Sequence, residues 1–296
     1  APLGMSRTRS SYRAFMAQDN RAISHMRGGR AWKPSPLRDA DLQSAAGGAS
    51  SSVNDMARWM ALVLAGGGWQ GQPLVAPDAL QAMLTPQSPG GGYGFGINVA
   101  GRTSGGLPLY DHSGAFVSGA STAVTLLPGL DLGIVALSNT WPVGVPEAVS
   151  RQFIDLVEKG EITQDWWALF SNAFRGVLAP TGAMLGLPEP TDPAPQQAWA
   201  RYTGQYGNDY LGQVQVDALR PLIGGGGRPG RLRLTIGPNR LEHLCTHWSG
   251  DDFVFAPPEE LASPGSLSLA RFDPAAGTLW LEVYDADHNG LLRRLA

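Results

Sequence analysis

The sequence contains one cysteine, two lysines and no long apolar run. Because Cys245 is the only cysteine, an intrachain disulfide is excluded. The formal net charge is -3, which argues against the basic surface that a nucleic-acid-binding protein uses. Without a run of about 20 apolar residues, no segment is predicted to span a membrane. The two lysines, Lys33 and Lys159, restrict any chemistry that requires a lysine side chain.

The composition is that of a globular protein. Hydrophobic residues make up 43% of the 296 residues and charged residues 16%. A chain of this length forms one to two domains and can bury a core without a disulfide or a metal ion. The 39 glycines and 23 prolines predict many turns and short strands.

Helix and strand signals alternate in the first half of the chain. A helix is predicted over residues 53–64, because Ser52 is a favourable N-cap and apolar residues recur at helical spacing. Glycines at 66–68 end this helix, and residues 1–49 are expected to be irregular. The other predicted elements are a helix over 77–84, strands over 93–99, 121–127 and 132–138, and a helix over 145–157. In the turn at 128–131, a proline is expected to fix one torsion and Gly129 to supply the next.

The second half of the chain has a different pattern. Its proline density predicts a semi-rigid linker over 160–195, with a short aromatic helix around Trp166. Short alternating strands separated by turns then predict a small barrel or sandwich. The strands are expected at 212–216, 231–236, 241–248, 253–256, 266–272, 278–284 and 291–295. The predicted organisation is therefore an α+β chain with a first domain at 1–159, a linker at 160–195 and a second domain at 196–296.

The strongest candidate for chemistry is the segment at residues 110–115, around His112. Gly114 has no side chain to prevent the close approach of a substrate backbone. The N–H of Ala115 could then face an oxyanion that develops during a reaction. The competing interpretation is that His112 is an ordinary half-buried histidine in a turn.

Four short segments in the first half add context to His112. They are residues 2–8 (PLGMSRT), 46–59 (AGGASSSVNDMARW), 93–96 (YGFG) and 112–114 (HSG). In this order they resemble the serine beta-lactamase and penicillin-binding-protein superfamily, in particular its esterase and D-peptidase branch, in which histidine-x-glycine is the third motif. The resemblance covers about residues 1–158. It implies the C-terminal half of a beta-lactamase-like antiparallel sheet packed with helices.

Two segments of the second half carry a weaker resemblance. Residues 202–206 (YTGQY) and 247–253 (HWSGDDF) resemble the lipocalin-like domain appended to some members of that branch. This likeness favours a small antiparallel β-barrel over a sandwich for residues 196–296.

The sequence also departs from the family. The family's nucleophilic serine lies in Ser-x-x-Lys, whose lysine takes the serine proton. Here arginine stands three residues before Lys33 and leucine three before Lys159. The second motif, Tyr-x-Asn or Tyr-x-Ser, is matched only by residues 206–208 (YGN), which follow the third motif and are interpreted as a chance match.

Two explanations account for the absent motifs. The one we expect is that a precursor was cut near the start of this chain and that its N-terminal piece remains bound as a second chain. The other is a truncated, non-catalytic relic. The first is favoured because the sheet would otherwise have an uncovered edge strand and one uncovered face.

The resemblance implies a serine hydrolase that cleaves amide, peptide or ester bonds through an acyl-enzyme, acting on small peptides, amides or esters, including those with D-residues. His112 would hydrogen-bond the nucleophile network or a substrate carboxylate, and the Ala115 N–H would complete the oxyanion hole. Ser113, Gly114 and Phe116 would contact the substrate. The partner would be an N-terminal chain or segment that carries Ser-x-x-Lys and Tyr-x-Asn/Ser. The resemblance suggests a periplasmic or secreted protein, and no cofactor or metal is expected.

The competing hypothesis for the whole chain is a non-catalytic binding or structural module derived from the same fold. The intact third motif argues against it and the absent motifs argue for it.

A separate question is whether a metal site lies in the second half of the chain. His243, Cys245 and His247 alternate and would share one face of a strand. Such side chains suit zinc, but no fourth ligand is evident, so a structural role is the preferred interpretation.

Overall fold

The computed structural model describes residues 2–28, 31–35, 38–219, 230–258 and 261–295. The chain divides into two compact units, residues 1–177 and 178–296, which are described separately. Within the described ranges, no helix combines the length and apolar character that crossing a bilayer requires.

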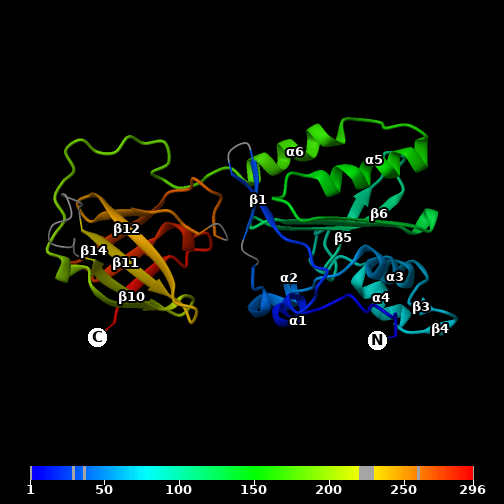
Figure 1. The fold of residues 1–296 in the computed structure, drawn as a ribbon, viewed down its shortest axis with the longest axis horizontal. Coiled ribbons are helices and arrows are strands. Elements are labelled where there is room, and N and C mark those ends of the chain that lie inside the picture. The colour runs from blue at the N-terminus through cyan, green and yellow to red at the C-terminus, as the bar shows by residue number, and fades with distance from the viewer. Residues whose placement is uncertain (1, 29–30, 36–37, 220–229, 259–260, 296) are drawn as a thin grey trace. The chain divides into compact units, whose positions relative to one another are not determined.

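The first unit is a small antiparallel sheet between two layers of helices. Its helices are α1 (Tyr12–Met16), η1 (Asp41–Gln43), α2 (Ser44–Gly47), α3 (Val53–Leu64), α4 (Pro77–Met83), η2 (Pro128–Leu130), α5 (Val145–Lys159) and α6 (Trp166–Val177). Its strands are β1 (His25–Gly28), β2 (Ala31–Pro34), β3 (Gly68–Trp69), β4 (Gln72–Pro73), β5 (Asn98–Arg102), β6 (Pro108–Phe116), β7 (Ala120–Leu127) and β8 (Leu132–Ser138). The main sheet has the order β5-β6-β7-β8, with α5 and α6 on one side and α1 to α4 on the other (Figure 1).

Helix α3 confirms the helix predicted over 53–64. The Ser52 hydroxyl accepts a hydrogen bond from the Asp55 N–H at 3.3 Å, which satisfies one of the free donors of the first turn. Met60 and Val63 are buried together with Leu126 of β7. The apolar stripe of α3 therefore forms the core on one face of the sheet.

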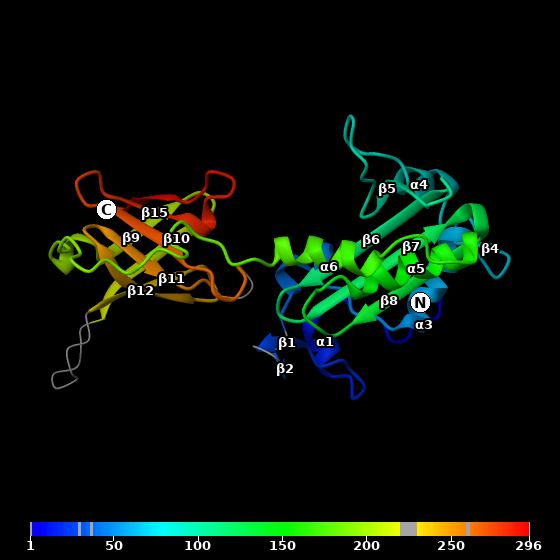
Figure 2. The same ribbon diagram turned by 90° about the horizontal axis from the view of Figure 1, so that it is seen from above.

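Helix α5 covers the opposite face of the sheet. It begins after Gly144 and extends the predicted helix by two residues, to Lys159. Ile154 is buried with Leu109 of β6 and Leu127 of β7. Seen from above, α5 and α6 lie over the β7 and β8 region (Figure 2). The sheet is thus covered on both faces, and the expectation that one face would be uncovered without a further segment is wrong.

Three local predictions for this unit are wrong. No strand covers 93–99: β5 begins only at Asn98, because Gly96 turns the chain with a φ of 77° and Phe95 is left 62% exposed. In the turn at 128–131, Asp131 and not Gly129 adopts the left-handed conformation, with a φ of 48°. Residues 1–49, expected to be irregular, contain the short helices α1, η1 and α2 and the β1–β2 hairpin.

The second unit is a closed antiparallel barrel. Its strands are β9 (Gly204–Asn208), β10 (Gly212–Leu219), β11 (Arg231–Ile236), β12 (Leu241–Ser249), β13 (Asp252–Phe255), β14 (Ser268–Asp273), β15 (Thr278–Leu281) and β16 (Leu291–Arg294), with 3-10 turns η3 (Trp199–Arg201) and η4 (Glu282–Tyr284). Each strand pairs with the next, and β16 closes the barrel on β9. The predicted barrel is confirmed. The sequence missed β9, whose two glycines weaken the strand signal.

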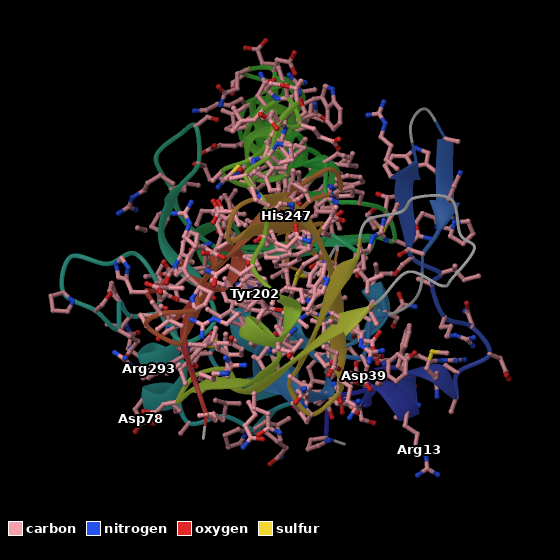
Figure 3. All side chains as sticks on the ribbon, turned by 90° about the vertical axis from the view of Figure 1, so that its left-hand side faces the viewer. Arg13, Asp39, Asp78, Tyr202, His247 and Arg293 are labelled. Atoms are coloured by element: carbon pink, nitrogen blue, oxygen red, sulfur yellow. The ribbon has the colours of Figure 1, made fainter. Side chains whose placement is uncertain are left out.

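The interior of the barrel is filled by aromatic side chains. Tyr202, Tyr206, Phe253 and Phe272 are each at most 3% exposed. The rings of Tyr202 and Phe253 meet edge to face, with centroids 5.2 Å apart. Figure 3 marks Tyr202 and His247 in this unit. Rings of this size bury a large apolar area and so contribute to the stability of the barrel.

Asp155 of α5 connects the helix to two neighbouring segments. Its carboxylate accepts hydrogen bonds from the Ser104 Oγ at 2.7 Å, from the Thr163 N–H and Oγ1 at 2.9 and 2.6 Å, and from the Trp166 Nε1 at 2.6 Å. Burial raises the pKa of Asp155, but the hydrogen bonds from Ser104, Thr163 and Trp166 lower it by more. The net result is a pKa of about 2, below the ordinary 3.8.

The depressed pKa of Asp155 predicts acid sensitivity in the first unit. Since the unfolded chain takes up the proton near pH 3.8 and the folded chain near 2, the stabilisation is complete above pH 4 and is lost as the pH falls toward 2. The difference is worth about 2 kcal/mol. The Asp155→Asn variant is expected to be less stable at pH 7 and to lose less stability on acidification. Urea unfolding followed by hydrogen exchange over residues 145–177 measures this.

The matched control for Asp155 is Glu161→Gln, which removes one exposed carboxylate just beyond the same helix. It is expected to retain the acid profile of the wild-type protein. Equal losses of stability between pH 5 and 2 in Asp155→Asn and in wild type would show that Asp155 does not carry this pH dependence.

Candidate active site

The residues that the sequence singles out lie on β6, in the interior of the sheet. From Tyr110 to Phe116, β6 pairs with β7. On its other side, the pairing with β5 ends at Asn98 opposite Asp111. Residues 112–116 therefore have no register partner on that side among the described strands. This open edge offers main-chain donors and acceptors to an extended chain, as in other cases of strand addition.

His112 and Ser113 are directed to opposite faces of the sheet, because side chains alternate along a strand. Tyr110, on the same face as His112, packs against the core under α3. The His112 Nδ1 lies 3.1 Å from the Tyr93 hydroxyl. The Ser113 hydroxyl instead donates a hydrogen bond to Glu147 of α5. The structure thus brings His112 together with Tyr93 but does not bring the side chains of His112 and Ser113 together.

A pocket of about 200 Å³ lies beside Ser113, where both β5 and α5 begin. The Asp111 carboxylate lies in its wall and is 3.0 Å from the Arg151 Nη2 of α5. It also accepts a hydrogen bond from the Asn98 Nδ2 at 2.9 Å. These contacts connect the start of β5 and the middle of β6 to α5. Glu147 occupies the first turn of the same helix and is buried.

The remaining predicted residues occupy the open edge. A Cβ added to Gly114 would lie 2.9 Å from a threonine hydroxyl on β7, so a side chain there would crowd the neighbouring strand. Ala115 is exposed. The Phe116 ring lies 4.5 Å below the Arg38 guanidinium, and a Cβ at Gly47 would lie 3.0 Å from the same ring. Phe116 is therefore held by the glycine segment that precedes α3.

The first two motif segments meet at Asp55 in α3. Its carboxylate accepts hydrogen bonds from the Arg7 N–H at 2.7 Å and the Thr8 hydroxyl at 2.9 Å. The Arg58 Nη1 lies 3.1 Å from it and also donates to the Gly4 carbonyl at 2.7 Å. Burial raises the pKa of Asp55, but these hydrogen bonds and the Arg58 charge lower it below the ordinary value. The PLG turn is thereby fixed to the start of α3.

Sequence reasoning missed several residues of this site. The sequence marks Tyr93 only as part of the YGFG segment, and it does not single out Glu147 or Arg151. The one signal for the latter pair is their i, i+4 spacing, which places two opposite charges on the same face of a helix. Their separate partners on β6 lie more than 30 residues away in the sequence and could not be read from local pattern.

The three alternating residues of β12 face the barrel interior. His243 is 1% exposed, and its Nε2 lies 2.8 Å from the Tyr284 hydroxyl. Cys245 is fully buried, and burial raises the pKa of its thiol. The His247 Nε2 lies 3.0 Å from the Gly250 carbonyl oxygen. Over the described ranges, no group of three or more His, Cys, Asp or Glu side chains is placed to hold a metal ion.

The site combines an open strand edge, the His112–Tyr93 hydrogen bond, and a pocket beside Ser113 that contains two carboxylates. It does not combine these with a serine–lysine pair. Lys33 lies on the β1–β2 hairpin and Lys159 at the C-terminal end of α5, and neither lines the pocket. Within the described residues, this arrangement contains no activated nucleophile of the kind that amide or ester cleavage requires.

Parts of this chain are similar to known proteins. A family model described as Beta-lactamase matches residues 1–159. The crystal structure of the C-terminal domain of a penicillin binding protein is 40% identical over its match, which covers 37% of this chain and 96% of that chain with a TM-score of 0.31. No curated protein matches the chain.

Proposed function

The chain belongs to the beta-lactamase family, whose model matches residues 1–159, and on that premise we propose that it is part of a serine hydrolase. The proposed reaction is cleavage of an amide, peptide or ester bond of a small substrate, D-residues included, through an acyl-enzyme. The observation that supports it is the open edge at residues 112–116 beside the His112–Tyr93 pair. The serine, its lysine base and the tyrosine motif come from a segment outside these 296 residues.

In the proposed mechanism, the substrate extends along the open edge of β6. The serine oxygen of the other segment bonds to the substrate carbonyl carbon, and its proton passes to the lysine of that segment. The scissile C–N or C–O bond then breaks as its leaving atom takes up a proton, and water later releases the acyl group. His112, oriented by Tyr93, hydrogen-bonds this proton network. The Ala115 N–H stabilises the oxyanion, a contribution typically worth about 3 kcal/mol.

The surface of the first unit supports a covering segment. Among the described strands, β8 pairs only with β7, so the outer edge of residues 132–138 is open. Helix α5 exposes Val149, Phe153 and Leu156, which form a stripe at i, i+4 and i+7. An open sheet edge near an apolar helix stripe is typical of a surface that another polypeptide segment covers.

A second candidate is a non-catalytic binding or structural module, in which the first unit supports recognition by the barrel. The observation that favours it is the position of Lys33 and Lys159, neither of which lines the pocket. This hypothesis predicts a folded chain that never forms an acyl-enzyme, with or without an added segment.

A fluorophosphonate probe distinguishes the two candidates, because it reacts with activated serines. The chain is purified together with every polypeptide that accompanies it, and heat-denatured material serves as the control. Label on a co-purifying chain, or on a longer uncut product, is expected for the hydrolase. Folded material without label would contradict the hydrolase. Label on a serine of the 296-residue chain itself would contradict the proposal that the nucleophile lies on another segment.

A further inference from the structure

The pocket beside Ser113 adjoins the edge where an extended substrate would lie. It is lined by Asn98 and Asp111, the last register pair between β5 and β6, and by His112 and Ser113, the first residues beyond it. A chain added along residues 112–116 therefore passes the mouth of the pocket. The groups in its wall determine which substituent can occupy it.

The Ser113 hydroxyl presents acceptor character to this pocket. Ser113 is exposed, and its hydroxyl donates its proton to the Oε1 of Glu147. A hydroxyl has one proton and two lone pairs, so a serine whose proton is committed offers only lone pairs to a third group. A carboxylate at this position would meet acceptor oxygen, whereas an N–H group would find a partner.

The formal charge of the residues that line the pocket is -1, with His112 counted as neutral. Its lining contains Asp111, Glu147 and Arg151, and the Arg151 guanidinium is directed to Asp111 and to the Arg102 carbonyl, at 3.0 and 3.3 Å. Glu147 is 7% exposed, and its Oε2 is buried without a hydrogen-bond partner in the described part of the chain. A buried charge that lacks a counter-charge acts over several ångströms in the low local dielectric.

We propose that Glu147 and Ser113 make this pocket selective for a positively charged N–H donor, such as a primary ammonium, and against a carboxylate. This inference deepens the proposed function and rests on it, because the pocket is a substrate subsite only if the chain is part of a hydrolase. Glu147 acts as a specificity-determining residue because its charge sets the preference and its hydrogen bond orients Ser113.

Small ions test the preference without requiring catalysis. The purified chain is titrated with propylammonium chloride, with sodium propionate of similar size and opposite charge, and with tetramethylammonium chloride, which lacks N–H donors. Backbone amide shifts of residues 111–114 and 145–151 report binding. Propylammonium is expected to bind saturably and at least tenfold more tightly than either other ion. Equal affinity for propionate would overturn the charge preference, and equal affinity for tetramethylammonium would overturn the role of Ser113 as acceptor.

Variants assign the preference to Glu147. Glu147→Gln is expected to weaken propylammonium binding at least tenfold, whereas Glu161→Gln, an exposed charge removed nearby, is expected to leave it unchanged. Ser113→Ala keeps the Glu147 charge and is expected to reduce the difference in affinity between propylammonium and tetramethylammonium. This variant tests the site even if Glu147→Gln does not fold. Wild-type binding by Glu147→Gln would overturn the inference.

The outcome is independent of the hydrolase test. Ammonium selectivity in material that never reacts with the fluorophosphonate probe would retain the pocket and reject the proposed function. Probe labelling without ammonium selectivity would retain the function and reject the pocket.

Discussion

The His112→Ala variant is expected to be acylated roughly 10²–10⁴-fold more slowly than the wild-type protein, the range typical for loss of a positioned proton-transfer group. His112 is half-buried, and the side-chain contact that holds it is the Tyr93 hydroxyl at 3.1 Å. Truncation therefore removes the imidazole without leaving a large buried cavity, and the fold should survive. The measurement is the single-turnover rate with an ester substrate or fluorophosphonate, using the chain together with its nucleophile-bearing segment.

Two further variants make the His112 result specific. Tyr93→Phe deletes the hydroxyl partner but keeps the imidazole, so the expected loss is about tenfold, the rate equivalent of one hydrogen bond. His288→Asn, in an exposed barrel turn where asparagine tolerates the positive φ of 61°, should be acylated at the wild-type rate. A wild-type rate for His112→Ala, with circular dichroism unchanged, would remove His112 from the mechanism and leave only the open strand edge.

The elements that the sequence predicts well are those whose ends carry local signals. Helix α3 begins at the Ser52 cap and ends ahead of three glycines, and strand β11 coincides with the predicted range. The missed strands depend on their neighbours instead. In β6, polar residues 111–113 interrupt the apolar alternation, and the strand is stabilised by seven register pairs with β7. Strand β9 contains two glycines but is held from both sides, by β10 and β16.

The residues of the candidate site also differ in whether a local sequence signal marks them. His112 and Gly114 could be found because a histidine, a small residue and a glycine stand together before a strand pair. The pocket could not, since Glu147 reaches Ser113 across 34 residues and Tyr93 reaches His112 across 19. Periodicity indicates which face of a helix is buried, but not which carboxylate meets which hydroxyl. The two faces of β6 matter most for the site, because they separate the side chains of His112 and Ser113, which are adjacent in the sequence.

The barrel is expected to lose about 3 kcal/mol of stability between pH 6.5 and pH 4 through His243 alone. Burial lowers the pKa of His243 from 6.5 to about 4. Above pH 6.5 the imidazole is neutral in both states, and the contribution is fully present. As the pH falls toward 4, the unfolded chain binds a proton that the folded chain excludes, so stability is lost in that window. Urea unfolding at pH 7 and pH 4.5, followed by hydrogen exchange in β12, measures the loss.

The change of the unfolding free energy with pH distinguishes titration of His243 from a simple loss of packing. His243→Gln removes the ring that stacks on Phe255 at 4.6 Å and bonds Tyr284, so it should be less stable at pH 7. It should nevertheless lose little more on acidification, because the titrating group is gone. His247→Gln on the same strand retains His243 and should retain the slope. A wild-type slope in His243→Gln would place the acid sensitivity elsewhere. Asp155 cannot account for it, since its window lies below pH 4 and in the other unit.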